Sequence, residues 1–195
     1  MFDFNQALSI DYSSHVLYII LGVVIIRLTR IRKPKIRFLP SKENLKFFGV
    51  LAVFFLLIEI FTTEFGSMSI YSWVSIYGIL PVALRFVFEG FFVGWTEEYL
   101  FRGAIQTALN RRFSSITVIK IRQGTIITSL IFGFAHSINI LLGQPIDTTI
   151  IQITFATFFG LVVGTYYDKT YDLSGAAWIH NIVDFTGMAF QFIPI

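Results

Sequence analysis

Three charged side chains lie inside one stretch of sequence that is otherwise apolar enough to enter a membrane. The stretch covers residues 91–109 and contains Glu97, Glu98 and Arg102. A single charge at the centre of a bilayer costs roughly 2.5–3.5 kcal/mol on insertion scales. A fold that accepts this segment therefore has to supply partners for its charges, and this requirement constrains the chain more than any other feature.

Helical spacing separates the roles of the two glutamates. On a helix, Glu98 and Arg102 are one turn apart and can pair directly, which offsets much of the cost of burying them. Glu97 points about 100° away from Glu98, and no Lys or Arg lies three or four residues from it. We predict that Glu98 and Arg102 form a structural ion pair, while Glu97 is available for chemistry.

Composition favours an integral membrane protein over a soluble enzyme. Of 195 residues, 55% are hydrophobic and 14% are charged, against roughly 25% charged residues in soluble domains. The absence of cysteine excludes disulfides, thiolate catalysis and Cys-based zinc sites. We expect one all-α domain over residues 1–195, a polytopic membrane bundle of six to seven hydrophobic helices, with the motif-bearing core at 91–192.

The hydrophobic stretches are short and separated by polar loops. Residues 1–14 lack a basic segment and a small-residue cleavage site, so we expect no cleavable signal peptide. His15, at the start of the first stretch, is interpreted as an interfacial residue. Glu59 and Glu64 are expected beyond the apolar part of the second. The predicted helices are 16–26, 45–61, 70–88, 91–109, 124–142, 148–167 and 176–192.

Charge distribution predicts the orientation of the chain. Eight of the twenty residues from Arg27 to Lys46 are Lys or Arg, which is typical of a cytoplasmic loop; the alternative is a site for lipid headgroups or a partner. A second basic loop follows residue 110. Both loops lie on one side if residues 70–88, interrupted by Pro81 and Arg85, do not cross. We therefore favour six crossings and one interfacial helix, in a bacterial cytoplasmic membrane, and no nucleic-acid partner.

The remaining polar residues of the apolar helices are few. His136 lies within the fifth hydrophobic stretch, and His180 and Asp184 are four residues apart on the last, so both face the same side. Three helices that each contribute an acid or a histidine are suited to lining a polar cavity in lipid, and such intramembrane groups are usually functional. Glycines recur in these helices where close packing is expected: Gly133, Gly160, Gly164, Gly175 and Gly187.

These residues fall into three ordered motifs. They are Glu97-Glu98-x-x-x-Arg102, Phe132-x-x-x-His136 and His180-x-x-x-Asp184. In this order, and each in an apolar helix, the motifs resemble those of the CPBP (CAAX protease and bacteriocin-processing, or Abi) intramembrane proteases. The resemblance covers about half of the chain. The last motif position accepts Asn or Asp in that family, and here it is Asp184.

The resemblance implies hydrolysis of a peptide bond within the membrane. In that interpretation Glu97 is the base for water, and His136 shares the water and passes its proton to the leaving amine. His180 and Asp184 stabilise the oxyanion or position the water. No cofactor is expected; the alternative is a zinc ion bound by His136 and His180, with Glu97 as ligand or base.

Two other classes of protein remain open on the sequence. One is a non-catalytic immunity or scaffold protein in which the polar cluster only packs. The other is an ion-coupled transporter that uses the same cluster as a relay. Substrate identity is also open: the expected partner is a peptide or a membrane protein in the lipid bilayer, and the CAAX label does not require a prenylated substrate.

Overall fold

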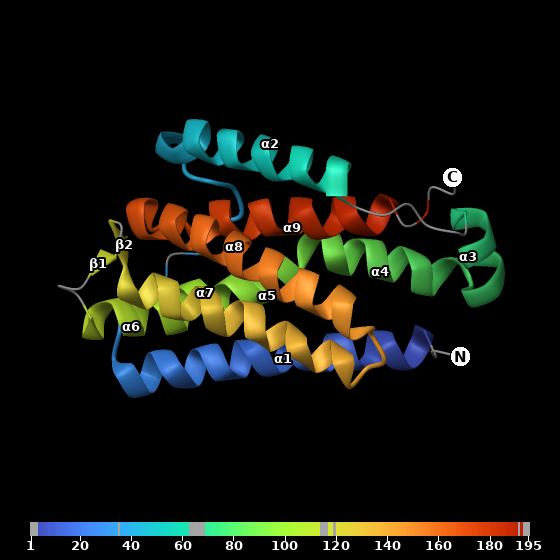
Figure 1. Cartoon of the computed structure of the whole chain (residues 1–195), viewed down its shortest axis with the longest axis horizontal. Coiled ribbons are helices and arrows are strands. Elements are labelled where there is room, and N and C mark those ends of the chain that lie inside the picture. The colour runs from blue at the N-terminus through green and yellow to red at the C-terminus, as the bar shows by residue number, and fades with distance from the viewer. Residues whose placement is uncertain are drawn as a thin grey trace.

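The structure, a computed structural model, is a bundle of helices (Figure 1). It describes residues 4–34, 36–62, 69–113, 117–118, 120–190 and 192. Lys35 of the basic linker and Glu64, expected beyond the second hydrophobic stretch, lie outside the described residues. The all-α fold class predicted from the sequence is confirmed. A single two-residue antiparallel pairing, β1 with β2, is the only strand structure in the described part of the chain.

The elements follow the hydrophobic stretches, with changes at their ends. In chain order they are α1 (Phe4–Thr29), η1 (Lys42–Asn44), α2 (Leu45–Thr62), α3 (Ile70–Tyr77), α4 (Ile79–Phe91), α5 (Val93–Glu98), η2 (Tyr99–Gln106), α6 (Thr107–Arg112), β1 (Thr117–Val118), β2 (Ile121–Arg122), α7 (Gln123–Ala135), η3 (His136–Ile140), α8 (Ile146–Thr170) and α9 (Leu173–Phe190). η1 and η3 are 3₁₀ turns, whereas η2 is a π-helix.

Residues 70–88, predicted to be a kinked span or an interfacial helix, form two helices. Gly78, with φ +90°, ends α3 and begins α4, because this left-handed conformation is open to glycine and strained for other residues. α4 then continues through α5, η2 and α6 as one helical stretch, Ile79–Arg112. Pro81 sits in the first turn of α4, where its missing N–H does no harm. The segment that carries the motif is therefore longer than predicted.

Three helical stretches of the described chain are long and apolar enough to cross a membrane. They are Tyr12–Thr29, Ile79–Arg112 and Ile146–Thr170. α9 lies beside α4 and α8 (Figure 1), but it carries His180, Asn181 and Asp184, and these polar residues lower its mean hydropathy. The chain is a membrane protein by these helices; six crossings remain a prediction.

The basic segments meet at one end of the bundle. Arg111 Nη1 donates to the carbonyls of Thr29 (3.4 Å) and Arg30 (3.1 Å), which ties the end of α6 to the end of α1. The linker then contacts the start of α9, where the backbone N–H of Ser41 donates to Asp172 at 2.8 Å. In Figure 1 this is also the end that carries β1 and β2. We call it the basic end.

The core is aromatic and lies between α2, α8 and α9. Phe55 and Phe159 are fully buried with ring centroids 4.8 Å apart. Phe132 of α7 packs beside them against Phe101, at 4.9 Å. Large side chains from four helices thus fill the centre of the bundle and hold the polar segment in place.

Glycines allow the helices to approach closely, as predicted. At Gly133 an added Cβ would collide with the side chain of Thr157, and at Gly160 it would come within 3.2 Å of Ser129. Gly94 shows the same feature but was not predicted: a Cβ there would lie 2.6 Å from Oδ1 of Asn181, and its N–H donates to that atom at 2.7 Å. This contact sets α5 against α9.

Gly94→Ala is expected to lower the free energy of unfolding by about 1–3 kcal/mol, because the methyl group has no space between α5 and α9. The control is Gly49→Ala in α2, where nothing lies within 4 Å of the added Cβ. That change should be neutral or stabilise by about 0.5–1 kcal/mol. Thermal melting of both purified variants in detergent checks this; equal melting temperatures would contradict the close α5–α9 contact.

Candidate active site

The predicted ion pair forms between the end of α5 and the π-helix η2. Arg102 Nε lies 3.0 Å from Oε2 of Glu98, and neither side chain is exposed. The guanidinium also stacks over the ring of Phe132, with Cζ 5.0 Å from the centroid. π-Helical turns are frequent at functional sites, and this one carries the Arg102 that pairs with Glu98.

Glu98 holds a second partner that the sequence analysis did not assign to it. His180 Nδ1 lies 3.0 Å from Oε1 of Glu98, so one buried carboxylate bridges the arginine of η2 and the histidine of α9. An ionised carboxylate only accepts hydrogen bonds, and Nδ1 therefore carries the proton in this contact. The contact orients the imidazole and directs Nε2 away from Glu98.

Nε2 of His180 faces two carboxylates. Asp184 Oδ2 lies 3.4 Å from it and Glu97 Oε2 lies 3.8 Å from it. The one-turn spacing of His180 and Asp184 on α9 thus places both side chains on one face, as predicted. The structure brings Glu97, His180 and Asp184 together from helices α5 and α9.

The interpretation of His15 as an interfacial residue was wrong. His15 is 8% exposed, and its Nε2 lies 3.4 Å from Oε1 of Glu97. Its ring packs against Phe88 with centroids 4.9 Å apart. α1 thus supplies a histidine to the carboxylate that the sequence analysis left without a partner in its own helix.

His136 lies where α7 ends and not within a continuous helix. The α-helix stops at Ala135, and His136 begins the 3₁₀ turn η3. Its Nδ1 is 2.9 Å from the carbonyl oxygen of Phe132, and its ring stands edge-on to the Phe132 ring at 5.1 Å. The side chain is half-buried, so the change of helix type places it at the mouth of the polar cluster.

One cavity of about 300 Å³ joins these groups. Its wall includes Glu97, His136, His180 and Asp184, together with His15. An adjoining cavity of about 330 Å³ shares the last three motif residues and reaches Glu59 of α2. Further polar residues of its wall are Arg85, Glu89 and Gln152; Arg85 Nη2 lies 3.6 Å from Oε1 of Glu89. The site is therefore a polar chamber enclosed by apolar helices.

Comparison with protein families decides the assignment. The family described as type II CAAX prenyl endopeptidase Rce1-like matches residues 78–186, more than half of the chain. The chain belongs to the Rce1-like family. This confirms the resemblance to the CPBP intramembrane proteases and, at family level, an endopeptidase acting on membrane-associated peptides. Comparisons with curated proteins and with solved structures give no match.

Two of the acid or histidine side chains that sequence reasoning missed come from outside the Rce1-like region. His15 of α1 and Glu59 of α2 both precede residue 78, where the family match begins. The sequence contained only a weak indication of their role, because each is simply an ionisable residue at one end of an apolar helix. Such a residue is as compatible with an interface as with a site, and only the packing of the bundle separates the two.

The residues of this Rce1-like site do not form a ready metal centre. Within the described chain, no three His, Asp or Glu side chains are grouped so as to hold a metal ion. Nδ1 of His136 lies beside a backbone carbonyl and Nδ1 of His180 beside Glu98. Zinc binding by these residues stays an alternative that the metal analysis proposed below tests.

Proposed function

We propose that this Rce1-like chain is an intramembrane endopeptidase that hydrolyses a peptide bond of a membrane-associated substrate, with Glu97 and His136 activating the water. One observation carries the proposal. The four motif residues Glu97, His136, His180 and Asp184 line a single cavity inside a bundle with membrane-compatible helices. Acids and histidines gathered in such a place are expensive to bury and are typical of function.

Glu97 is the general base in this mechanism. A water molecule in the cavity gives its proton to the Glu97 carboxylate as its oxygen attacks the carbonyl carbon of the scissile bond. His136, in the wall of the same cavity, hydrogen-bonds the same water, takes the proton from Glu97 and transfers it to the leaving nitrogen. The C–N bond then breaks to give a carboxylic acid and an amine, and a proton passes between them to leave a carboxylate and an ammonium group.

His180 and Asp184 act on the carbonyl oxygen. Glu98 accepts the hydrogen bond of Nδ1 (3.0 Å), so in the imidazolium form Nε2–H is the donor that points into the cavity. That donor stabilises the negative charge of the tetrahedral intermediate. Asp184, 3.4 Å from Nε2, accepts from Nε2–H until the oxyanion takes its place, or donates to the oxyanion when it is protonated itself.

The orientation follows from the basic end of the bundle. Lys and Arg are enriched on the cytoplasmic side of membrane proteins. In this proposal the chain is a multi-pass protein of the cytoplasmic membrane, and its basic end faces the cytoplasm. Peptides anchored in the membrane are the proposed substrates. Prenylated CAAX peptides are the first to test, and unprenylated membrane peptides the second.

A paired assay separates the proposal from its two alternatives. Purified protein in liposomes is given farnesylated and unprenylated peptides, and products are identified by mass spectrometry; parallel liposomes report proton and ion flux. The proposal expects cleavage and no flux. Flux without cleavage would indicate a transporter, and neither activity in folded protein would indicate a scaffold.

His15→Gln is expected to lower kcat by about 10–100-fold with little change in KM, because misplacement of a reacting group by about 1 Å costs up to this much. The physical reason is the 3.4 Å contact between His15 and Glu97, which positions the carboxylate. The control is Val16→Ala, a neighbouring α1 residue that is 57% exposed. Equal kcat in the two variants would show that His15 does not contribute to catalysis.

Metal dependence distinguishes the two mechanisms. If Glu97 and His136 activate water unaided, extensive chelation should leave the cleavage rate nearly intact, and metal analysis should find well under one zinc per chain. Stoichiometric zinc that disappears in His136→Ala protein would overturn the metal-free mechanism. Inhibition by a chelator alone is not decisive, because chelators also perturb detergent-solubilised protein.

A further inference from the structure

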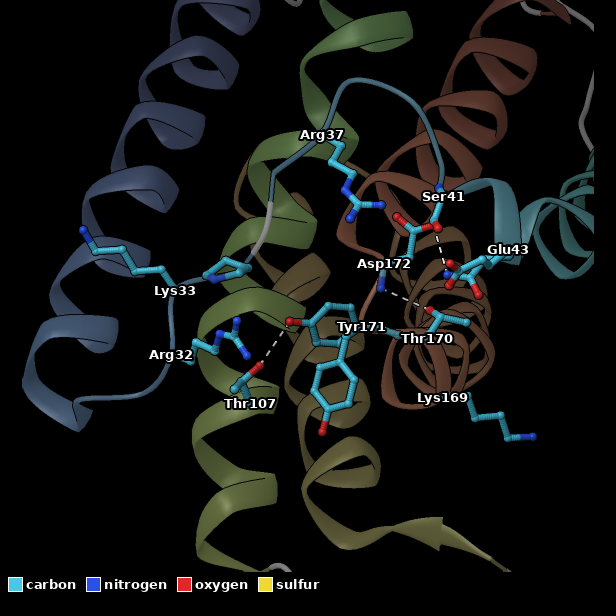
Figure 2. Close-up of a pocket in the computed structure, with 13 residues that line it drawn as sticks. Arg32, Lys33, Arg37, Ser41, Glu43, Thr107, Lys169, Thr170, Tyr171 and Asp172 are labelled. Carbon is cyan, nitrogen blue, oxygen red and sulfur yellow. Dashed lines mark hydrogen bonds between the residues drawn. The ribbon is translucent and has the colours of Figure 1, made fainter.

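A second cavity lies at the basic end, apart from the active site. It has a volume of about 670 Å³, and none of its lining residues lines the cavities around Glu97 (Figure 2). Its wall is built by the linker that follows α1, by Thr107 at the start of α6, and by the end of α8. Segments distant in sequence thus enclose one chamber.

Two arginines of the linker border this chamber. Arg32 lies beside the hydroxyl of Thr107, and Arg37 lies across the chamber from it (Figure 2). Thr107 Oγ1 donates to the carbonyl of Arg102 at 2.9 Å and lies 3.4 Å from the hydroxyl of Tyr167, which also lines the chamber. Lys33 and Lys169 stand at the rim with their side chains directed outward (Figure 2). Two guanidinium groups with neighbouring hydroxyls are suited to binding phosphate oxygens.

The carboxylates of the wall do not cancel this charge. Both carboxylate oxygens of Asp172 accept hydrogen bonds from other parts of the chain. Its Oδ2 accepts from the N–H of Ser41 at 2.8 Å and from the hydroxyl of Tyr166 at 3.1 Å. Its Oδ1 accepts from the N–H of Gly175 at 3.2 Å. Glu43 is exposed. The wall carries four cations against these two carboxylates.

Hydrogen bonds to its backbone hold the linker in place, so its position does not depend on the arginine side chains. Ser174 Oγ donates to the carbonyl of Arg37 at 2.7 Å, and the N–H of Arg37 donates to Ser174 Oγ at 3.2 Å. Trp178 Nε1 donates to the carbonyl of Phe38 at 2.6 Å. The chamber is therefore formed in advance, and both arginines can be replaced without removing these contacts.

The surroundings point to a lipid and not to a soluble anion. Next to Arg37, Ile36 and Phe38 are 63% and 70% exposed, which is expected of residues that enter the bilayer interface. They line an apolar groove of about 640 Å³ together with Phe91, Phe92 and Trp95. The linker thus presents cations to one cavity and apolar side chains to another, as the two parts of a phospholipid require.

We propose that the chamber between Arg32, Arg37, Thr107 and Tyr167 binds the phosphate of an anionic phospholipid headgroup, with an acyl chain along the adjacent groove. Each Lys or Arg near an anionic membrane surface strengthens binding roughly five-fold. Loss of both arginines should therefore weaken retention of the lipid by about thirty-fold. This inference does not depend on proteolysis.

The test measures lipid retained by the full-length protein. Protein in phosphatidylcholine is supplied with phosphatidylglycerol, and bound lipid is quantified by native mass spectrometry. Arg32→Gln/Arg37→Gln is compared with Arg27→Gln/Lys46→Gln, which removes the same charge from exposed residues outside the chamber. Melting in phosphatidylcholine alone verifies that both variants are folded. For the unchanged protein, inorganic phosphate is added to detergent solutions and the melting temperature is followed.

The proposal expects phosphatidylglycerol to be retained over phosphatidylcholine, and the preference to be lost only in Arg32→Gln/Arg37→Gln. Equal loss of the preference in both double variants would show that anionic lipid is attracted by surface charge in general, and the proposed site would be wrong. A melting shift with inorganic phosphate, without a preference for phosphatidylglycerol, would overturn the lipid assignment. Retention of neither ligand by the unchanged protein would overturn the proposal altogether.

Discussion

Glu97→Gln is expected to lower the cleavage rate by about 10²–10⁴-fold, the usual contribution of a general base, while the protein stays folded. The amide has nearly the shape of the carboxylate but cannot take the proton of water. Glu97 has no pairing partner in its own helix, and its partners His15 and His180 lie at 3.4 and 3.8 Å. Rates are measured on purified protein in liposomes, and folding by thermal melting.

The control for Glu97→Gln is Asp147→Asn, which removes the charge of an exposed carboxylate in the first turn of α8. This variant should cleave at the parent rate. A well-folded Glu97→Gln protein with full activity would show that another group takes the proton, and the assignment of the base would be wrong.

Glu98→Ala and Arg102→Ala are expected to lower the free energy of unfolding by about 3–5 kcal/mol each, because each leaves a buried charge without its partner. Both side chains are fully buried and 3.0 Å apart. Glu98→Ala also releases Nδ1 of His180, so activity should fall even in the fraction that folds. The measurements are the yield of folded protein and its melting temperature.

Arg85→Ala is the matched control for the ion pair. Arg85 and Glu89 have the same four-residue spacing in the same helical stretch, but their side chains are 26% and 18% exposed and 3.6 Å apart. A partly exposed pair loses less solvation on burial than a fully buried one, so removing one partner should destabilise less. If Glu98→Ala and Arg102→Ala melt like the parent protein, the structural role of the pair is wrong.

Local spacing explains what the sequence could predict about the site. The Glu98–Arg102 pair and the shared face of His180 and Asp184 both depend on residues one helical turn apart. Such relations hold in any helix, whatever surrounds it. The close approach at Gly133 was predictable for a related reason, since small residues mark tight helix contacts in lipid.

Contacts between distant segments were beyond this kind of reasoning. His15 meets Glu97 only because α1 packs against η2, and no spacing rule relates residues 82 positions apart. The bridge from Glu98 to His180 likewise depends on how α5 and α9 pack. The breaks at Gly78 and at His136 were missed because hydropathy continues across them, although the backbone changes direction or helix type.

The central claim is that this Rce1-like chain hydrolyses peptide bonds through Glu97. The most direct measurement is product analysis in ¹⁸O-labelled water, with the purified protein in liposomes and prenylated and unprenylated peptides as substrates. The account predicts a released fragment, a new carboxylate that carries one ¹⁸O atom, and no such product from Glu97→Gln. No labelled product from folded parent protein, or the same product at the same rate from Glu97→Gln, would contradict it.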